Sequence, residues 1–202
     1  MLRLTALLLL LPTLAAAQEL PALHDVTGVA SDDVLNLREG PSAGDRIIGT
    51  LAPDAENVEV TALNDDGSWG RVNTQERSGW ASMRFLARQA GQDADTLPVP
   101  MRCFGTEPFW SLDVTASGLT FEGVDLDPVE TSLAARSTVR GIRGRHGFAG
   151  WGAQETAGMH GIVRREACSD GMSDRHYGLS LDLLVSMDGE LSQYAGCCSL
   201  AP

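Results

Sequence analysis

The 202-residue sequence predicts an all-β protein made of two domains. Short runs that alternate apolar and polar residues recur along the chain, and clusters of turn residues separate them. No convincing long amphipathic helix follows the first 17 residues. Residues 89–100 are rich in small and polar side chains and include two prolines, which is typical of a linker. The chain therefore divides into a β domain before the linker and another after it.

The first 17 residues have the features of a cleavable export signal. Arg3 supplies the positive start, Leu7–Leu11 form a short apolar run, and Ala15–Ala17 offer small residues for cleavage. The apolar stretch is too short to span a bilayer and is interrupted by Pro12. The first cysteine, Cys103, lies far beyond any lipidation site. We expect a periplasmic or secreted protein that is not inserted in a membrane.

The charged residues exclude several classes of function. The chain has 15 basic and 27 acidic residues, and its formal net charge is −12. An acidic chain is unsuited to binding nucleic acid or anionic lipid. All the basic residues are arginines, which excludes a phosphate-binding-loop lysine, a Schiff-base lysine and a Ser-x-x-Lys nucleophile pair.

Strand and turn patterns begin in the first half. Val58–Leu63 alternates apolar and polar residues, Asn64–Gly67 is a turn, and Trp69–Val72 resumes a strand. Leu35 and Leu37 flank Asn36, so the two leucines should face the same side of a strand.

Residues 24–88 resemble a bacterial SH3 (SH3b) domain. The segments that carry this resemblance are Leu35–Ser42, Ile48–Leu51, Val58–Val60, Gly67–Trp69, Arg71–Val72, Ser78–Trp80 and Phe85–Leu86. The resemblance implies a small SH3-like barrel that binds peptidoglycan or an envelope peptide. Trp69 and Trp80 either pack in the core or, as candidate ligand-binding residues, form an aromatic groove for an extended peptide.

The second half, residues 101–202, repeats the β pattern. Trp110–Val114 and Leu119–Phe121 flank a turn, and Leu179–Val185 leads to a turn at Asp188–Gly189. The pattern predicts an antiparallel β-barrel or sandwich. This half resembles an uncharacterised family of bacterial envelope proteins through Gly105–Trp110, Cys168–Asp174 with Tyr177, and Gly196–Cys197. That resemblance implies no particular activity.

All four cysteines, Cys103, Cys168, Cys197 and Cys198, lie in this second half. An even number in an exported protein favours disulfides. A bridge between the neighbouring Cys197 and Cys198 is disfavoured because its ring would be strained. If these two lie on a strand, their side chains point to opposite faces, so one bridge faces the core. Which of them pairs with Cys103 and which with Cys168 stays open.

Catalytic and metal sites find little support in the sequence. A cysteine peptidase needs a histidine well downstream of its nucleophile, but only 34 residues follow Cys168 and His176 is the one histidine among them. The histidines lack the close spacing of a zinc site. Asp170 and Asp174 are weak candidates for Ca²⁺, since their spacing does not match a calcium loop and they also suit the capping of a tight turn. We expect no cofactor.

One basic stretch, 136–146, stands out in the acidic chain. Its Arg140, Arg143 and Arg145 are candidates for binding an anionic ligand, because guanidinium groups pair well with carboxylates and phosphates. The same arginines also suit a solvated edge that balances nearby acids. The glycine-rich segment 147–152 follows, and we expect it to be a flexible loop that carries Trp151 over a barrel mouth as a lid.

The leading prediction is an exported, noncatalytic envelope protein whose SH3b domain binds peptidoglycan or a peptide. The alternative is a protein that binds a small ligand inside the second barrel. A cell-wall hydrolase or thiol enzyme has less support.

Overall fold

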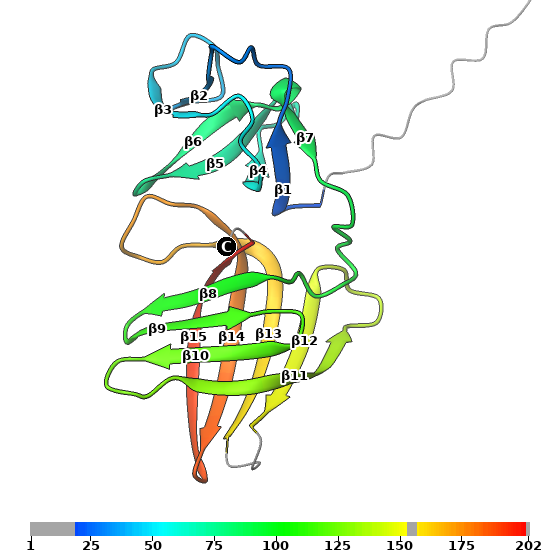
Figure 1. Ribbon diagram of the computed structural model, residues 1–202, viewed down its shortest axis with the longest axis vertical. Coiled ribbons are helices and arrows are strands. Elements are labelled where there is room, and N and C mark those ends of the chain that lie inside the picture. Colours follow the sequence, from blue (N-terminus) through cyan, green and yellow to red (C-terminus); the bar gives the residue numbers. More distant parts are fainter. Residues whose placement is uncertain (1–18, 153–156, 201–202) are drawn as a thin grey trace, which may run out of the picture.

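A computed structural model of the chain describes residues 19–152 and 157–200. It contains two β domains, one above the other in Figure 1, as the sequence predicts. The predicted export signal, 1–17, lies outside the described residues. Within the described part of the chain, no helix has the length and apolar character needed to cross a membrane.

The N-terminal domain is an antiparallel sheet of seven strands in the order β3-β2-β6-β5-β4-β1-β7. The strands are β1 (Ala22–Val26), β2 (Leu35–Arg38), β3 (Ile47–Leu51), β4 (Val58–Leu63), β5 (Trp69–Thr74), β6 (Arg77–Ser82) and β7 (Leu86–Arg88), with a 3-10 turn, η1 (Met83–Phe85), before the last.

The core of this domain follows the alternation of its strands. Leu35 and Leu37 are both buried on one face of β2, as predicted, and they pack with Val60, Val72 and other apolar side chains. The intervening residues of β5 and β6 face outward, which places Trp69 and Trp80 on the outer face of this sheet.

The C-terminal domain is a closed antiparallel barrel of eight strands, which decides between the barrel and the sandwich that the sequence left open. Each strand pairs with its neighbours in the chain, and the last pairs with the first. The strands are β8 (Met101–Thr106), β9 (Phe109–Val114), β10 (Gly118–Gly123), β11 (Val129–Thr138), β12 (Arg145–Trp151), β13 (Ala157–Cys168), β14 (Tyr177–Met187) and β15 (Glu190–Ser199).

Side chains fill the interior of the barrel. Phe121, Leu112, Leu119, Met159, Leu179, Leu181 and Leu183 are almost completely buried there. Trp110, Phe121 and Tyr194 form an aromatic cluster whose ring centres lie 4.9–6.1 Å apart. These residues occupy the space in which the alternative hypothesis placed a small ligand.

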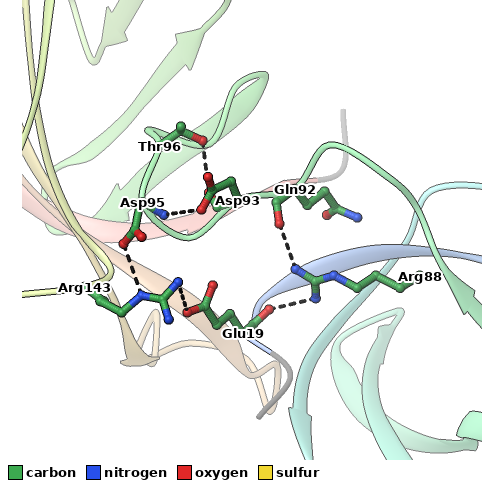
Figure 2. Close-up of polar contacts among 7 residues, drawn as sticks. All are labelled: Glu19, Arg88, Gln92, Asp93, Asp95, Thr96 and Arg143. Atoms are coloured by element: carbon green, nitrogen blue, oxygen red, sulfur yellow. Dashed lines mark hydrogen bonds and ion pairs between the residues drawn. The ribbon is translucent and has the colours of Figure 1, made fainter. Parts of the chain in front are cut away.

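The linker lies against the barrel instead of spanning open solvent. Leu97 is only 6% exposed and belongs to the barrel core, and Ala94 is 2% exposed. Figure 2 shows the polar contacts around this segment: Arg143 pairs with Glu19 at 2.8 Å and with Asp95 at 3.1 Å. Arg88 donates to the Glu19 carbonyl at 2.8 Å. The N-terminal segment, the linker and the barrel are therefore joined.

A loop between β13 and β14, residues 169–176, docks onto the tip of the β5–β6 hairpin. The Asp174 amide donates to the Glu76 carbonyl at 2.9 Å, and its carbonyl accepts from Ser78 at 3.1 Å. Arg175 donates to the Gln75 carbonyl and lies 3.3 Å from the Glu76 carboxylate. This loop adds backbone pairing to the contact between the domains.

A buried carboxylate lies in the same contact. Glu59 on the outer face of β4 accepts hydrogen bonds from the Ser199 hydroxyl at 2.6 Å and the Leu200 amide at 3.1 Å. Burial raises the pKa of Glu59, although these two hydrogen bonds oppose the shift. Gly178 faces Pro21 so closely that an added Cβ would lie 2.8 Å from the proline ring. The two domains are therefore in close contact both at Glu59 and where Gly178 faces Pro21.

Candidate functional site

The N-terminal domain has a groove of about 450 Å³ between the loop 27–34 and the outer face of β2, β5 and β6. Two aromatic side chains, Trp69 and Phe85, line it together with two arginines, Arg38 and Arg84, and the carboxylate Asp33. Apolar residues of the loop complete the wall, and Val34 among them is 42% exposed. We call this hollow the aromatic groove.

A tight hairpin turn positions Trp69. The Asn64 side chain accepts a hydrogen bond from the Trp69 amide at 2.9 Å, and the Asn64 amide donates to the Trp69 carbonyl at 3.0 Å. Gly67 in this turn has a φ of +72°, a conformation that glycine adopts without strain. The Asn64–Gly67 turn predicted from the sequence therefore holds the tryptophan at the mouth of the groove.

The facing wall is held by backbone contacts. The Thr27 amide donates to the Phe85 carbonyl at 2.9 Å, which holds the loop against η1. The Arg84 guanidinium lies over the Phe85 ring, 4.4 Å from its centre. A cation held on an aromatic face beside an apolar wall can receive a carboxylate while the apolar wall packs against a side chain.

Trp80 lies on the same outer face but does not line the aromatic groove. It is half-buried on β6, opposite Arg71 of β5 and Arg38 of β2. The Arg71 guanidinium covers its ring at 4.7 Å. Of the two tryptophans singled out in the sequence, Trp69 contributes to the groove directly and Trp80 extends the face beside it.

This geometry can be compared with known families. Residues 33–87 match the bacterial SH3 domain family. They form a bacterial SH3 domain. No curated protein and no solved structure matches the chain. The strands of the SH3 domain extend beyond the match at its start, because β1 begins at Ala22 and pairs with both β4 and β7.

Sequence analysis did not identify four side chains of the aromatic groove: Asp33, Arg38, Arg84 and Phe85. Arg38 and Phe85 lie in segments that carry the resemblance to the bacterial SH3 domain, which is the one signal available for them. The other two are single charged residues in short connecting segments, and the SH3 fold brings them beside Trp69.

The candidate arginines of the C-terminal barrel lie in the turn after β11 and at the start of β12. Arg140 and Arg143 lie in the turn between β11 and β12, whereas Arg145 is exposed on β12. The Arg143 guanidinium is engaged by Glu19 and Asp95, and these acids hold its pKa above the ordinary value. These pairs are of the kind that the charge-balancing alternative describes, and ligand binding by the three arginines stays a prediction.

The prediction of a flexible loop at 147–152 is wrong, because β12 runs through Gly147–Trp151. The glycines of β12 allow neighbouring strands to approach closely, since a Cβ on Gly150 would lie 2.4 Å from the Ser132 carbonyl oxygen. Trp151 is 42% exposed and packs edge-on against His160. It stands at the far end of β12 from Arg145, about 20 Å along the strand.

The cysteines form two disulfides, Cys103–Cys198 and Cys168–Cys197. Adjacent Cys197 and Cys198 bond to different partners, as the disfavoured vicinal ring predicts. Cys103 and Cys198 are 0% exposed, and Cys168 is partly exposed. Cys168 has no free thiol in this state, so it cannot act as a nucleophile. Two structural disulfides indicate an extracytoplasmic, oxidising compartment.

Asp170 caps a turn. Its carboxylate accepts hydrogen bonds from the Ser173 amide at 2.9 Å, the Ser173 hydroxyl at 2.7 Å and the Met172 amide at 3.1 Å. Burial alone would raise the pKa of Asp170, but these bonds lower it overall. Asp174 uses its backbone to pair with the SH3 hairpin. The described residues contain no group of three or more side chains that could hold a metal ion.

Proposed function

We propose that this protein is a periplasmic or secreted, noncatalytic envelope protein whose SH3 domain binds peptidoglycan or a peptide through the aromatic groove. The observation that carries the proposal is the placement of Trp69 and Phe85 beside Arg84 in one groove. Aromatic walls pack against an extended peptide, and the guanidinium pairs with a carboxylate such as those on the peptides of the cell wall.

Noncatalytic binding is supported by the state of the cysteines. Both disulfide bonds are formed, and Cys168, the cysteine that the sequence analysis considered as a peptidase nucleophile, is in one of them. The groove itself is lined by side chains suited to packing and pairing. We expect the barrel to fix the orientation of the SH3 domain, since the contacts of Glu59 and of the loop 169–176 join the two domains.

Cosedimentation of the full chain with purified cell-wall sacculi tests the proposal. We expect retention of the wild type, and a loss of at least about fivefold in affinity in W69A and R84Q, since each removes a contact at the centre of the groove. W151A is the matched control, an exposed tryptophan at the far end of β12.

The binding proposal is contradicted by no retention of the wild type, or by equal retention of R84Q, which changes an exposed side chain. Sacculi stripped of their peptides distinguish peptide from glycan as the ligand. Release of soluble wall fragments by the wild type would contradict the noncatalytic part of the proposal.

A further inference from the structure

A crevice lies where the linker meets the end of the barrel that faces the SH3 domain. Its volume is about 370 Å³, which is within the range of small-molecule sites. We call it the junction crevice. Its walls come from β1, the linker, β11, β13 and the residue that follows β15, Leu200.

Two arginines of the junction crevice lack an anionic partner. Nη1 of Arg165 donates to the Pro21 carbonyl at 2.8 Å, and Nη2 of Arg136 donates to the Ala116 carbonyl at 2.6 Å. Among residues 19–152 and 157–200, neither guanidinium has a carboxylate within 4.0 Å. The Nε of Arg165 is buried and has no acceptor among these residues.

Burial distinguishes Arg165 from the other unpaired arginines. Several arginines among the described residues have no carboxylate within 4.0 Å, but Arg165 is the one arginine among them with a buried nitrogen that has no hydrogen-bond partner. Removing a charged group from water without a paired anion costs free energy. Burial accordingly lowers the pKa of Arg165, and the Arg88 guanidinium acts in the same direction. An anionic ligand would supply the missing acceptor.

The remaining walls indicate what the anion is attached to. Leu97, Pro98, Val99 and Leu200 form an apolar side of the crevice, and Leu200 is 5% exposed. Asp93 lines the crevice as well, and Glu19 and Glu59 lie close enough to act on the charge of Arg165. These three acids reduce the local positive charge, which favours a ligand with a single negative charge over a doubly charged phosphate.

We propose that the junction crevice binds a small amphiphilic carboxylate. The carboxylate pairs with Arg165 and Arg136, and the apolar body of the ligand packs against Leu97 and Leu200. This site is separate from the aromatic groove and uses an arginine, Arg136, from the one basic stretch of the sequence. It lies at the junction of linker and barrel, outside the filled interior.

Titration of the isotope-labelled full chain with octanoate, followed by NMR amide shifts, tests the proposal. We expect saturable shifts at Gln92, Leu97 and Leu200, and an affinity at least about tenfold lower in R165Q and in R136Q. Arg165 contacts Pro21, so R136Q provides a variant that leaves the domain contact intact. R145Q, an exposed arginine on β12, should bind like the wild type.

Matched probes separate charge from apolar packing. Octanol lacks the carboxylate and acetate lacks the apolar body, so each should bind at least about tenfold more weakly than octanoate. The proposal is overturned if octanol binds as well as octanoate or if R136Q and R165Q both bind like the wild type. It is also overturned if the shifts cluster on the outer face of the barrel around Ile162 of β13 and Leu184 of β14, two exposed apolar residues. Tighter binding of inorganic phosphate than of octanoate would also overturn it.

Discussion

The side chain of Asn73 and the backbone of His176 form a pair of hydrogen bonds across the boundary between the two domains. Nδ2 of Asn73 donates to the His176 carbonyl at 3.0 Å, and Oδ1 accepts from the His176 amide at 3.0 Å. The Ser78 hydroxyl also donates to Oδ1 at 2.7 Å. The Asn73 side chain thus hydrogen-bonds both backbone groups of His176 in the loop 169–176, as a neighbouring β-strand would do.

Replacing Asn73 with alanine should destabilise the protein by about 1–2 kcal/mol, because the partly buried backbone groups of His176 lose their partners. Urea unfolding measures the change in the free energy of unfolding. Gln193→Ala removes an exposed amide from the outer face of β15 and serves as the control. An N73A protein as stable as this control would show that the pair contributes little to the contact between the domains.

Glu59→Gln should change the pH dependence of stability. Burial raises the pKa of Glu59 in the folded state. The buried side chain therefore favours the folded state in its protonated form. This contribution of Glu59 to the free energy of unfolding is complete below the ordinary glutamate pKa and is lost as pH rises through the raised value. The stability of E59Q relative to the wild type should increase as pH rises from the ordinary glutamate pKa, about 4.3, to the raised value, by about 1.4 kcal/mol for each unit by which the pKa is raised.

Urea unfolding of both proteins across this pH range gives the comparison. Glu190→Gln, a change at an exposed carboxylate, should leave the difference flat with pH. A difference between E59Q and the wild type that falls as pH rises would contradict the burial of an ionisable Glu59 in the contact.

Removal of either disulfide should destabilise the protein, and the Cys103–Cys198 bridge should matter more. It closes a sequence separation of 95 residues, compared with 29 for Cys168–Cys197. Loop-closure entropy corresponds to about 4–5 and about 3–4 kcal/mol respectively. Urea unfolding of the two paired Cys→Ala variants measures both losses. A larger loss for the Cys168–Cys197 pair would show that loop length does not control the effect.

Local patterns were enough to predict several of the strands, and the SH3 fold followed from the resemblance of residues 24–88 to the bacterial SH3 family. Alternation around Leu35 and Leu37 identifies a buried face, and Asn64–Gly67 has the composition of a turn wherever it occurs. Local patterns could not predict the pairing of the cysteines, because this pairing depends on which strands become neighbours when the barrel closes. The barrel places Cys103 directly opposite Cys198, and no feature near either residue in the sequence indicates this.

The errors and omissions also have physical causes. The glycines in β12 resemble those of a flexible loop, but they make room for neighbouring strands. At Gly150 the atom nearest to an added Cβ would be the Ser132 carbonyl oxygen of β11. Arg165 has no local signature, because its neighbours Pro21 and Arg136 are distant in the sequence. Contacts of this kind follow from the closed barrel and from the contact between domains.

The linker should be anchored by apolar burial more than by charge. Leu97 is 6% exposed within the barrel core, so Leu97→Ala should cost about 2–4 kcal/mol in the free energy of unfolding. The Arg143 side chain is 66% exposed, so solvent and salt screen its pairs with Glu19 and Asp95. Arg143→Gln should therefore change stability little, and less still in high salt. Urea unfolding at low and high salt compares the two variants. If R143Q destabilises the protein more than L97A, then the ion pairs, and not Leu97, hold the linker to the barrel.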